Sequence, residues 1–282
     1  MTQIAAMQAS GAERVDVLGV TSGEQVAMLR GKNFKELKMY TGSINLVPDS
    51  KNPDSPFSKK KVRLALSYAI NREAIVKARG FGLWLPANQI PTPVKPGHVK
   101  ETEFGRYDPE KARQLLKEAG YPDGFAIKIF VMPALVDRDA MVAVQRFLSE
   151  VGIKAELEFP DGGKYNEYRW KGWENGLLAQ AFRMLATSNL SYNFYCHNVP
   201  GQFPVLKRPD GLVEKLDESL KTLTAEKGKM EEMTRMIIDD AMIVPLYYIS
   251  EVRMLQPNVH DTGYFEVEAG TVYKPEQIWL SK

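Results

Sequence analysis

Cysteine and histidine are nearly absent from this 282-residue chain, which has one cysteine, Cys196, and three histidines. A single thiol cannot form an internal disulfide, and zinc sites built from several thiolates are excluded. The adjacent pair Cys196 and His197 is best explained as incidental, because neighbours in an extended segment point to opposite faces. We therefore expect no metal centre and no cofactor, since no phosphate-binding glycine loop or His-Glu-x-x-His motif occurs either.

Long apolar runs and an excess of one charge are also missing. No segment reaches the roughly 18 apolar residues needed to cross a bilayer, and the N-terminus lacks the pattern of an export signal. The net charge is only +2, because 37 lysines and arginines are matched by 35 acids. We therefore expect no nucleic-acid partner. The content of 44% apolar and 26% charged residues is typical of an ordinary folded protein.

Helix and strand patterns alternate along the chain. Apolar residues at three- and four-residue steps predict a helix from Ser58, then a second helix that Asn71 caps and Gly80 ends. Asp108 and Pro109 form the cap and first turn of another helix. Further helices are predicted over 139–150, 165–173, 212–223 and 229–242, and strands over 14–20, 37–40, 127–131, 153–159, 177–184 and 243–248. The short joints from 127 to 159 predict a parallel strand–helix–strand unit.

Three segments occur in the order and spacing of a known family. They are residues 55–57 (SPF), 61–76 (KVRLALSYAINREAIV) and 107–125 (YDPEKARQLLKEAGYPDGF). This series resembles the family 5 extracellular solute-binding proteins, the receptors that supply peptides, nickel chelates, opines and some oligosaccharides to ABC importers. The resemblance implies an α/β fold, a periplasmic-binding-protein-like lobe (type II, cluster C) with a mixed, partly parallel sheet flanked by helices, plus short pieces of the first lobe.

The resemblance also implies how the chain is divided. Receptors of this family are much longer than 282 residues, so we expect a fragment that lacks the N-terminal half. Residues 1–52 would belong to lobe I, residues 53–248 would form a complete lobe II, and residues 249–282 would return into lobe I. The turn-rich segment 48–56 is the expected crossover. With much of lobe I missing, we expect exposed apolar surface, self-association and weak solute binding.

A receptor without chemistry of its own is the function that the resemblance implies. It would bind a peptide-like or other small polar solute outside the cytoplasmic membrane, as a periplasmic or membrane-anchored extracellular protein, and deliver it to an ABC permease. The alternative is a sensory or interaction module with a vestigial solute site, which gene context would distinguish. An enzyme would need a convergent nucleophile and base, and the three histidines lie in predicted loops without any nucleophile motif.

Two loops supply the aromatic and polar side chains that a solute site requires. One covers residues 80–89, and the other covers residues 183–195, which match the family segment that faces the solute. The candidate ligand-binding residues are Trp84, Arg138, Trp173, Arg183, Thr187, Asn189, Tyr192 and Asn193. Each has a structural alternative, because aromatic rings more often pack in cores and Arg183 could equally form a structural ion pair.

The second loop departs from the family pattern. Dipeptide and oligopeptide receptors resembling this chain place an aspartate there, which holds the peptide amino terminus. Here the aligned positions are near Thr187 and Leu190, and residues 180–195 contain no acid. The arginine expected to meet a carboxylate falls near Val131, with Arg138 in the same connection as a substitute. The loop composition instead suits an anionic or polyhydroxyl solute.

Overall fold

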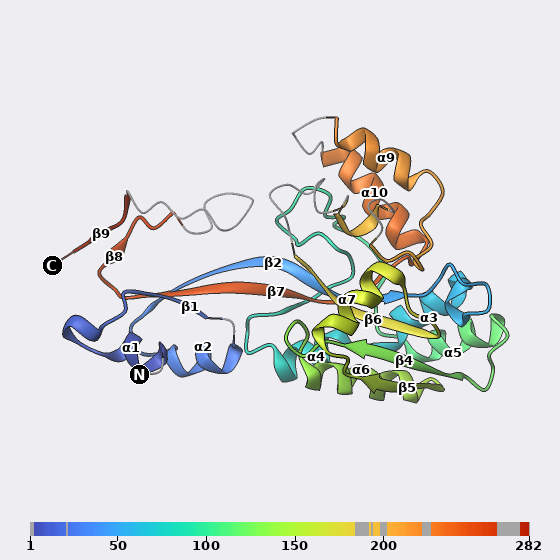
Figure 1. Ribbon diagram of the computed structural model, residues 1–282, viewed down its shortest axis with the longest axis horizontal. Coiled ribbons are helices and arrows are strands. Elements are labelled where there is room, and N and C mark those ends of the chain that lie inside the picture. The colour runs from blue at the N-terminus through green and yellow to red at the C-terminus, as the bar shows by residue number, and fades with distance from the viewer. Residues whose placement is uncertain are drawn as a thin grey trace.

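The computed structural model describes residues 3–20, 22–183, 192, 194–197, 202–221, 227–263 and 277–281. Within these ranges the chain builds a seven-stranded mixed sheet with helices on both faces (Figure 1). The strand order is β1-β7-β2-β6-β4-β5, and β3 pairs with β7 beside this path. The pairs β4–β5 and β4–β6 are parallel, and the remaining pairs are antiparallel. The predicted mixed, partly parallel sheet is confirmed.

The strands differ greatly in length. Their bounds are β1 Val17–Val20, β2 Lys35–Pro48, β3 Leu85–Pro86, β4 Phe125–Val131, β5 Ile153–Glu158, β6 Gly176–Arg183 and β7 Val244–Leu255. A separate two-stranded sheet joins β8 (Val259–His260) to β9 (Trp279–Leu280). The parallel register of β4 with β5, from Phe125 opposite Ile153, confirms the predicted parallel unit around the intervening helix.

Short polar side chains cap the N-termini of five α-helices in the described part of the chain. The bounds of the helices are α1 Gln3–Gln8, α2 Gly23–Leu29, α3 Lys60–Ala69, α4 Arg72–Arg79, α5 Pro109–Glu118, α6 Arg138–Glu150, α7 Gly162–Lys171, α9 Leu212–Ser219 and α10 Lys227–Asp239, with 3₁₀ turns η1 Gly11–Glu13 and η2 Pro56–Ser58. The Asn71 side chain accepts from the Ala74 amide at 2.9 Å, and Asp108 accepts from the Lys111 amide at 2.9 Å, as predicted. The helix predicted over 165–173 instead ends at Lys171, because Gly172 adopts a φ of +97°.

Both faces of the central strands are buried. Leu177 and Ala179 of β6 join a core formed with α3, α4, α5 and α6. Leu178 and Phe182, which point to the opposite face, join a second core that includes residues of α7, α9 and α10. Alternate residues of β6 therefore enter different cores, which explains why residues 177–182 are apolar on both faces, apart from the buried Gln180, rather than alternating.

Two long strands connect this sheet to the other end of the molecule (Figure 1). β2 has 14 residues, a length of about 45 Å at roughly 3.3 Å per residue. The prediction placed this strand only at 37–40 and ended the later strand at 248, whereas β7 continues to Leu255. Strand β1, the end of β7 and helices α1 and α2 contribute to a small third core that includes Met7, Val26 and Met254.

Asp49 links the segment after β2 to the start of β6. Its carboxylate is fully buried, and it accepts hydrogen bonds from Ser55 Oγ at 2.5 Å and from the Asn175 amide at 2.7 Å. Burial raises the pKa of Asp49 to about 6, although these hydrogen bonds act in the opposite direction. The folded chain therefore binds this proton more tightly than the unfolded chain does.

Replacing Asp49 by asparagine should change how stability depends on pH. A raised pKa gives a stabilising contribution that is complete below about pH 4 and is lost as the pH rises through about 6. At about 1.4 kcal/mol per pKa unit, the wild type should lose up to about 3 kcal/mol relative to Asp49→Asn between pH 4 and pH 7. Urea unfolding of both proteins at four pH values measures this difference, and a difference independent of pH would show that Asp49 does not titrate in this way.

Candidate functional site

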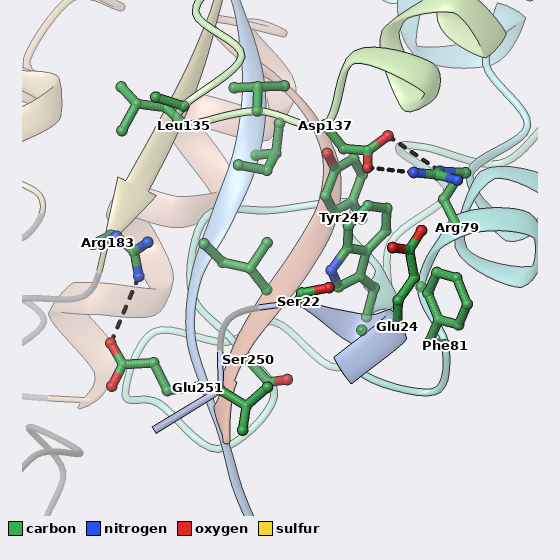
Figure 2. A pocket seen from close by; sticks show the side chains of 18 of the residues that line it. Ser22, Glu24, Arg79, Phe81, Leu135, Asp137, Arg183, Tyr247, Ser250 and Glu251 are labelled. Atoms are coloured by element: carbon green, nitrogen blue, oxygen red, sulfur yellow. Dashed lines mark hydrogen bonds and ion pairs between the residues drawn. The ribbon is translucent and has the colours of Figure 1, made fainter. Parts of the chain in front are cut away.

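A cavity of about 660 Å³ lies where the long strands leave the helical part of the molecule (Figure 2). One wall consists of the end of α4 with the turn after it, the connection 133–137 between β4 and α6, and Arg183 at the end of β6. The facing wall is the start of α2, from Ser22 to Glu24, and β2 and β7 form the floor. The cavity is open to solvent and has the size typical of small-molecule sites.

Two stacked aromatic rings form the centre of the floor. The indole of Trp84 lies 4.2 Å from the ring of Tyr247 at an interplanar angle of 12°. Ile44 and Ile249 line the cavity beside them. Tyr247 is only 1% exposed, and burial raises the pKa of its hydroxyl. The floor therefore offers a rigid, apolar surface on which the flat or apolar part of a solute could rest.

Arg79 occupies one end of the cavity, among carboxylates. Its Nη2 lies 3.0 Å from Asp137 Oδ2 and its Nε lies 3.3 Å from Asp137 Oδ1, while Asp139 approaches Nη2 at 3.3 Å. Glu24, on α2, faces the same guanidinium from across the cavity (Figure 2). The hydrogen bond to Asp137 raises the pKa of Arg79, and the charges of Asp137, Asp139 and Glu24 add to that rise.

Arg183 and Arg253 occupy the other end. Arg183 Nη1 lies 3.6 Å from Glu251 Oε1, and Arg253 Nη2 lies 3.4 Å from Glu251 Oε2. The Arg183 side chain is 53% exposed, so its ion pair is loose and screened by water. The amide of Arg183 donates to the hydroxyl of Tyr195 at 3.0 Å, which fixes the backbone at the end of β6.

The structure places two of the eight predicted ligand-binding residues, Trp84 and Arg183, in this cavity. Trp173 is 4% exposed and donates its Nε1–H to the Gly176 carbonyl at 3.1 Å. Tyr192 is 1% exposed, and its hydroxyl pairs with Thr234 Oγ1 at 2.5 Å. Arg138 lies over the ring of Phe159 at 4.6 Å, away from the cavity lining.

The remaining predicted positions are outside the described residues. These are Thr187, Asn189 and Asn193.

Sequence reasoning missed most of the charged lining. Glu251 and Arg253 share the strand face of Tyr247, because alternate residues of a strand point to the same side. Continuing that alternation beyond residue 248 would have found them. The meeting of Glu24 with Arg79 has no local signal, because α2 and α4 are brought together only by tertiary packing.

In the described part of the chain, no three histidine, cysteine, aspartate or glutamate side chains gather as a metal site would require. None of the helices described there combines the length and apolar character needed to span a bilayer.

Comparison with known proteins places this geometry in context. The model of the family described as bacterial extracellular solute-binding proteins, family 5 Middle, matches residues 2–200. The glutathione-binding protein GsiB of Salmonella choleraesuis (strain SC-B67) is 35% identical over 142 residues, which cover 50% of this chain and 28% of that protein.

Solved structures share the fold. HbpA2 from Haemophilus parasuis matches with a TM-score of 0.81 and 20% identity, over 95% of this chain and 54% of that one. The periplasmic binding protein DppA from Helicobacter pylori, in complex with the peptide STSA, matches with a TM-score of 0.77 and 22% identity, over 95% of this chain and 53% of that one. The predicted periplasmic-binding-protein-like fold is therefore confirmed, and the chain spans about half the length of these structures.

Proposed function

Since the chain belongs to the bacterial extracellular solute-binding proteins of family 5, we propose that it is the solute-binding part of an ABC-type importer. It would take up a small solute outside the cytoplasmic membrane and present it to a permease. The observation that carries this proposal is the cavity, which has an aromatic floor and walls from two parts of the chain that β2 and β7 connect. Such an arrangement can hold a solute between elements that move relative to one another.

The same arrangement supports a division of the chain into two lobes. Residues 53–248 would form one lobe, and residues 1–52 with 249–282 would form part of the other. The helix α2, which supplies one wall of the cavity, belongs to the second group, whereas α4, β4 and β6 belong to the first. Solute bound between them would favour the closed state by its stronger contacts there.

We infer the class of solute from the named relatives and from the residues that line the cavity. One relative is named for glutathione, and one structural neighbour was solved with a peptide. The cavity here combines arginines, carboxylates and an aromatic stack, which suits a peptide-like or other small polar solute. The named relatives are solute-binding proteins rather than enzymes, so we assign the chain a binding role without catalysis and a location in the periplasm or anchored to the outer face of the membrane.

Trp84 provides a test of solute binding by fluorescence. It lines the cavity, whereas Trp170 and Trp279 are 48% and 49% exposed and lie outside the lining. Titration with glutathione and with short peptides should produce a saturable change in emission that Trp84→Phe abolishes. Trp84→Ala should weaken binding at least tenfold, about 1.4 kcal/mol, because the stack on Tyr247 is lost.

The matched control is Trp170→Phe, which should keep the full response. Failure of every solute to change the emission would argue against the proposed function. A response that survives in Trp84→Phe would place the solute elsewhere in the molecule.

A further inference from the structure

A tight turn follows helix α4 and contacts α2. Its residues are Gly80, Phe81, Gly82 and Leu83, and the Leu83 amide donates to the Gly80 carbonyl at 2.7 Å. The two central residues both have a positive φ, of +49° at Phe81 and +77° at Gly82. This is the pattern of a type I′ turn, whose central positions usually carry glycine, asparagine or aspartate. A phenylalanine there is strained, which indicates that contacts with other elements hold it in place.

The Phe81 side chain packs on the start of α2. Gly23 is the first residue of that helix, and a Cβ added to it would lie 2.7 Å from Phe81 Cδ2 and 2.9 Å from Phe81 Cβ. The phenylalanine therefore occupies the space that a side chain at position 23 would need. Figure 2 shows its ring beside Glu24, the next residue of α2. The contact depends on glycine at this position, because any other residue would overlap with the ring.

Three consecutive carbonyl groups of the turn, those of residues 81, 82 and 83, accept hydrogen bonds from side chains of other elements. Their donors are, in that order, Arg30 Nη1 at 2.6 Å, Lys38 Nζ at 3.1 Å and Ser250 Oγ at 2.8 Å. Arg30 directly follows α2, Lys38 lies on β2 and Ser250 lies on β7. Glu36 accepts two hydrogen bonds of 2.8 Å from the Arg30 guanidinium, so this donor is oriented before it meets the turn.

The partners on β2 and β7 lie beyond a bulge in these long strands. The β2–β7 register shifts between Tyr40 and Gly42, which leaves Thr41 as an extra residue in that pairing. Strand β2 pairs with β6 only from Gly42 onward. Bulges of this kind bend and twist a strand locally. The turn is attached on the other side of the bulge, because α4 precedes it and β3, which follows it, pairs with β7 before residue 249.

We propose that the turn 80–83 is a latch that holds the two parts of the chain together around the empty cavity. Its contacts join residues 53–248 to α2 and to the parts of β2 and β7 beyond the bulge, so bending at Thr41 would break them. Arg30 does not line the cavity, so it acts on a solute only by positioning the turn.

This inference rests on the proposed function, because it concerns the closing of the same cavity. A solute held by both walls binds the closed arrangement, and its affinity is reduced by the fraction of molecules that are not closed. Weakening the latch should therefore lower the closed fraction and the affinity for solute by the same factor.

Gly23→Ala tests the latch, because the added methyl group acts as a wedge between α2 and Phe81. Double electron–electron resonance on the full chain without solute measures the distance between spin labels on Glu13→Cys and Arg146→Cys, which are exposed positions in the two parts. The native Cys196 is buried, and burial raises its pKa to about 12, so it should take up no label. The wild type should give one narrow distance distribution, and Gly23→Ala should add a second, separate population that lowers the closed fraction about twofold or more.

Two further variants identify the contact. Arg30→Gln removes the donor to the carbonyl of residue 81 and should also produce the second population. Gly23→Ala combined with Phe81→Ala should open the molecule no further than Phe81→Ala alone, because the wedge then meets no ring.

The matched controls change the same residue types elsewhere. Gly228→Ala lies near the start of α10, where an added Cβ meets nothing within 4 Å. Arg106→Gln removes an exposed arginine whose ion pair with Glu103 lies within residues 53–248. Both controls should give the distance distribution of the wild type.

The outcomes separate the latch from the function on which it rests. A wild-type distribution in either Gly23→Ala or Arg30→Gln would overturn the latch, even if glutathione still changes the emission of Trp84. An effect of Gly23→Ala that persists in full on top of Phe81→Ala would also overturn it, because the wedge would then act elsewhere. If the distances change as expected but neither glutathione nor any short peptide binds, the proposed function fails and the contact between the two parts is confirmed.

Discussion

Arg72→Met should lower the free energy of unfolding by about 3–5 kcal/mol, because it removes the partner of several buried carbonyl groups. The Arg72 guanidinium donates to the carbonyl oxygens of Pro245 at 2.7 Å, Ser67 at 2.8 Å, Gly105 at 3.0 Å and Ile70 at 3.2 Å. Burial lowers the pKa of Arg72 to about 9, so the side chain remains charged at neutral pH. Chemical denaturation at pH 7 measures the loss.

Arg106→Met is the matched control for this substitution. Arg106 is 72% exposed and its ion pair with Glu103 lies at the surface, so its replacement should change stability by no more than about 0.5 kcal/mol. Arg72→Lys should be intermediate, because a single ammonium has three donors and cannot reach all the carbonyls at once. Equal stability of Arg72→Met and Arg106→Met would show that the carbonyl network contributes nothing to folding.

Gly124→Ala should destabilise the chain by roughly 3 kcal/mol, from left-handed backbone strain and steric overlap together. Gly124 has a φ of +74°, and an added Cβ would lie 1.9 Å from the carbonyl oxygen of Gly152 and 2.5 Å from its carbonyl carbon. Both contacts are with backbone, so no side chain can move aside. The substitution would force apart the starts of β4 and β5, which pair from Phe125 and Ile153.

Gly228→Ala is a control for which we expect a change in stability of the opposite sign. Gly228 lies near the start of α10, and an added Cβ there would meet nothing within 4 Å. Alanine is favoured over glycine in a helix, so this variant should be more stable by about 0.5–1 kcal/mol. Thermal unfolding of both variants beside the wild type measures the two shifts. A Gly124→Ala protein as stable as the wild type would mean that folding does not require the close approach of Gly124 to the Gly152 backbone.

Arg72 and Gly124 both lie in the segments that resemble the family. Arg72 lies in the segment 61–76, and Arg63 in the same segment donates to the carbonyl oxygens of Phe57, Asp240 and Ala241. Gly124 is the next-to-last residue of the segment 107–125. The Arg63 and Arg72 side chains and the Gly124 backbone support the sheet and the turns that join it to the helices. The segments therefore predicted the fold well, but they do not lie in the cavity lining and could not identify the solute.

Local rules predicted the elements whose causes are local. The caps at Asn71 and Asp108 lie within three residues of the amides that they accept from, so the sequence alone indicates where α4 and α5 begin. β2 was predicted too short because its second half, Gly42–Pro48, begins with glycine, ends with proline and carries the polar residues Ser43 and Asn45, which local rules associate with turns. The structure buries both polar residues, since this half of β2 is paired on both sides.

The cavity could not be predicted from local rules, because its lining comes from segments that are far apart in the sequence. Trp84 and Arg183 were found because aromatic and basic residues in loops are common in binding sites. The absence of an acid from residues 180–195 indicated an anionic or polyhydroxyl solute. In the structure, however, Glu251 from β7 lies beside Arg183, and Glu24 and Asp137 face Arg79. Acids from distant parts of the chain therefore restore the negative charge that the loop lacks.

Native mass spectrometry of the chain, purified gently from a rich medium, tests the central claim most directly. If the cavity holds a solute above Trp84 and Tyr247, the wild type should show a second species that is heavier by one small molecule. Trp84→Ala, prepared in the same way, should show much less of it or none. The mass of the added molecule would identify the solute class. Identical spectra for the two proteins, whether bare or loaded, would contradict the assignment of this cavity as the solute-binding site.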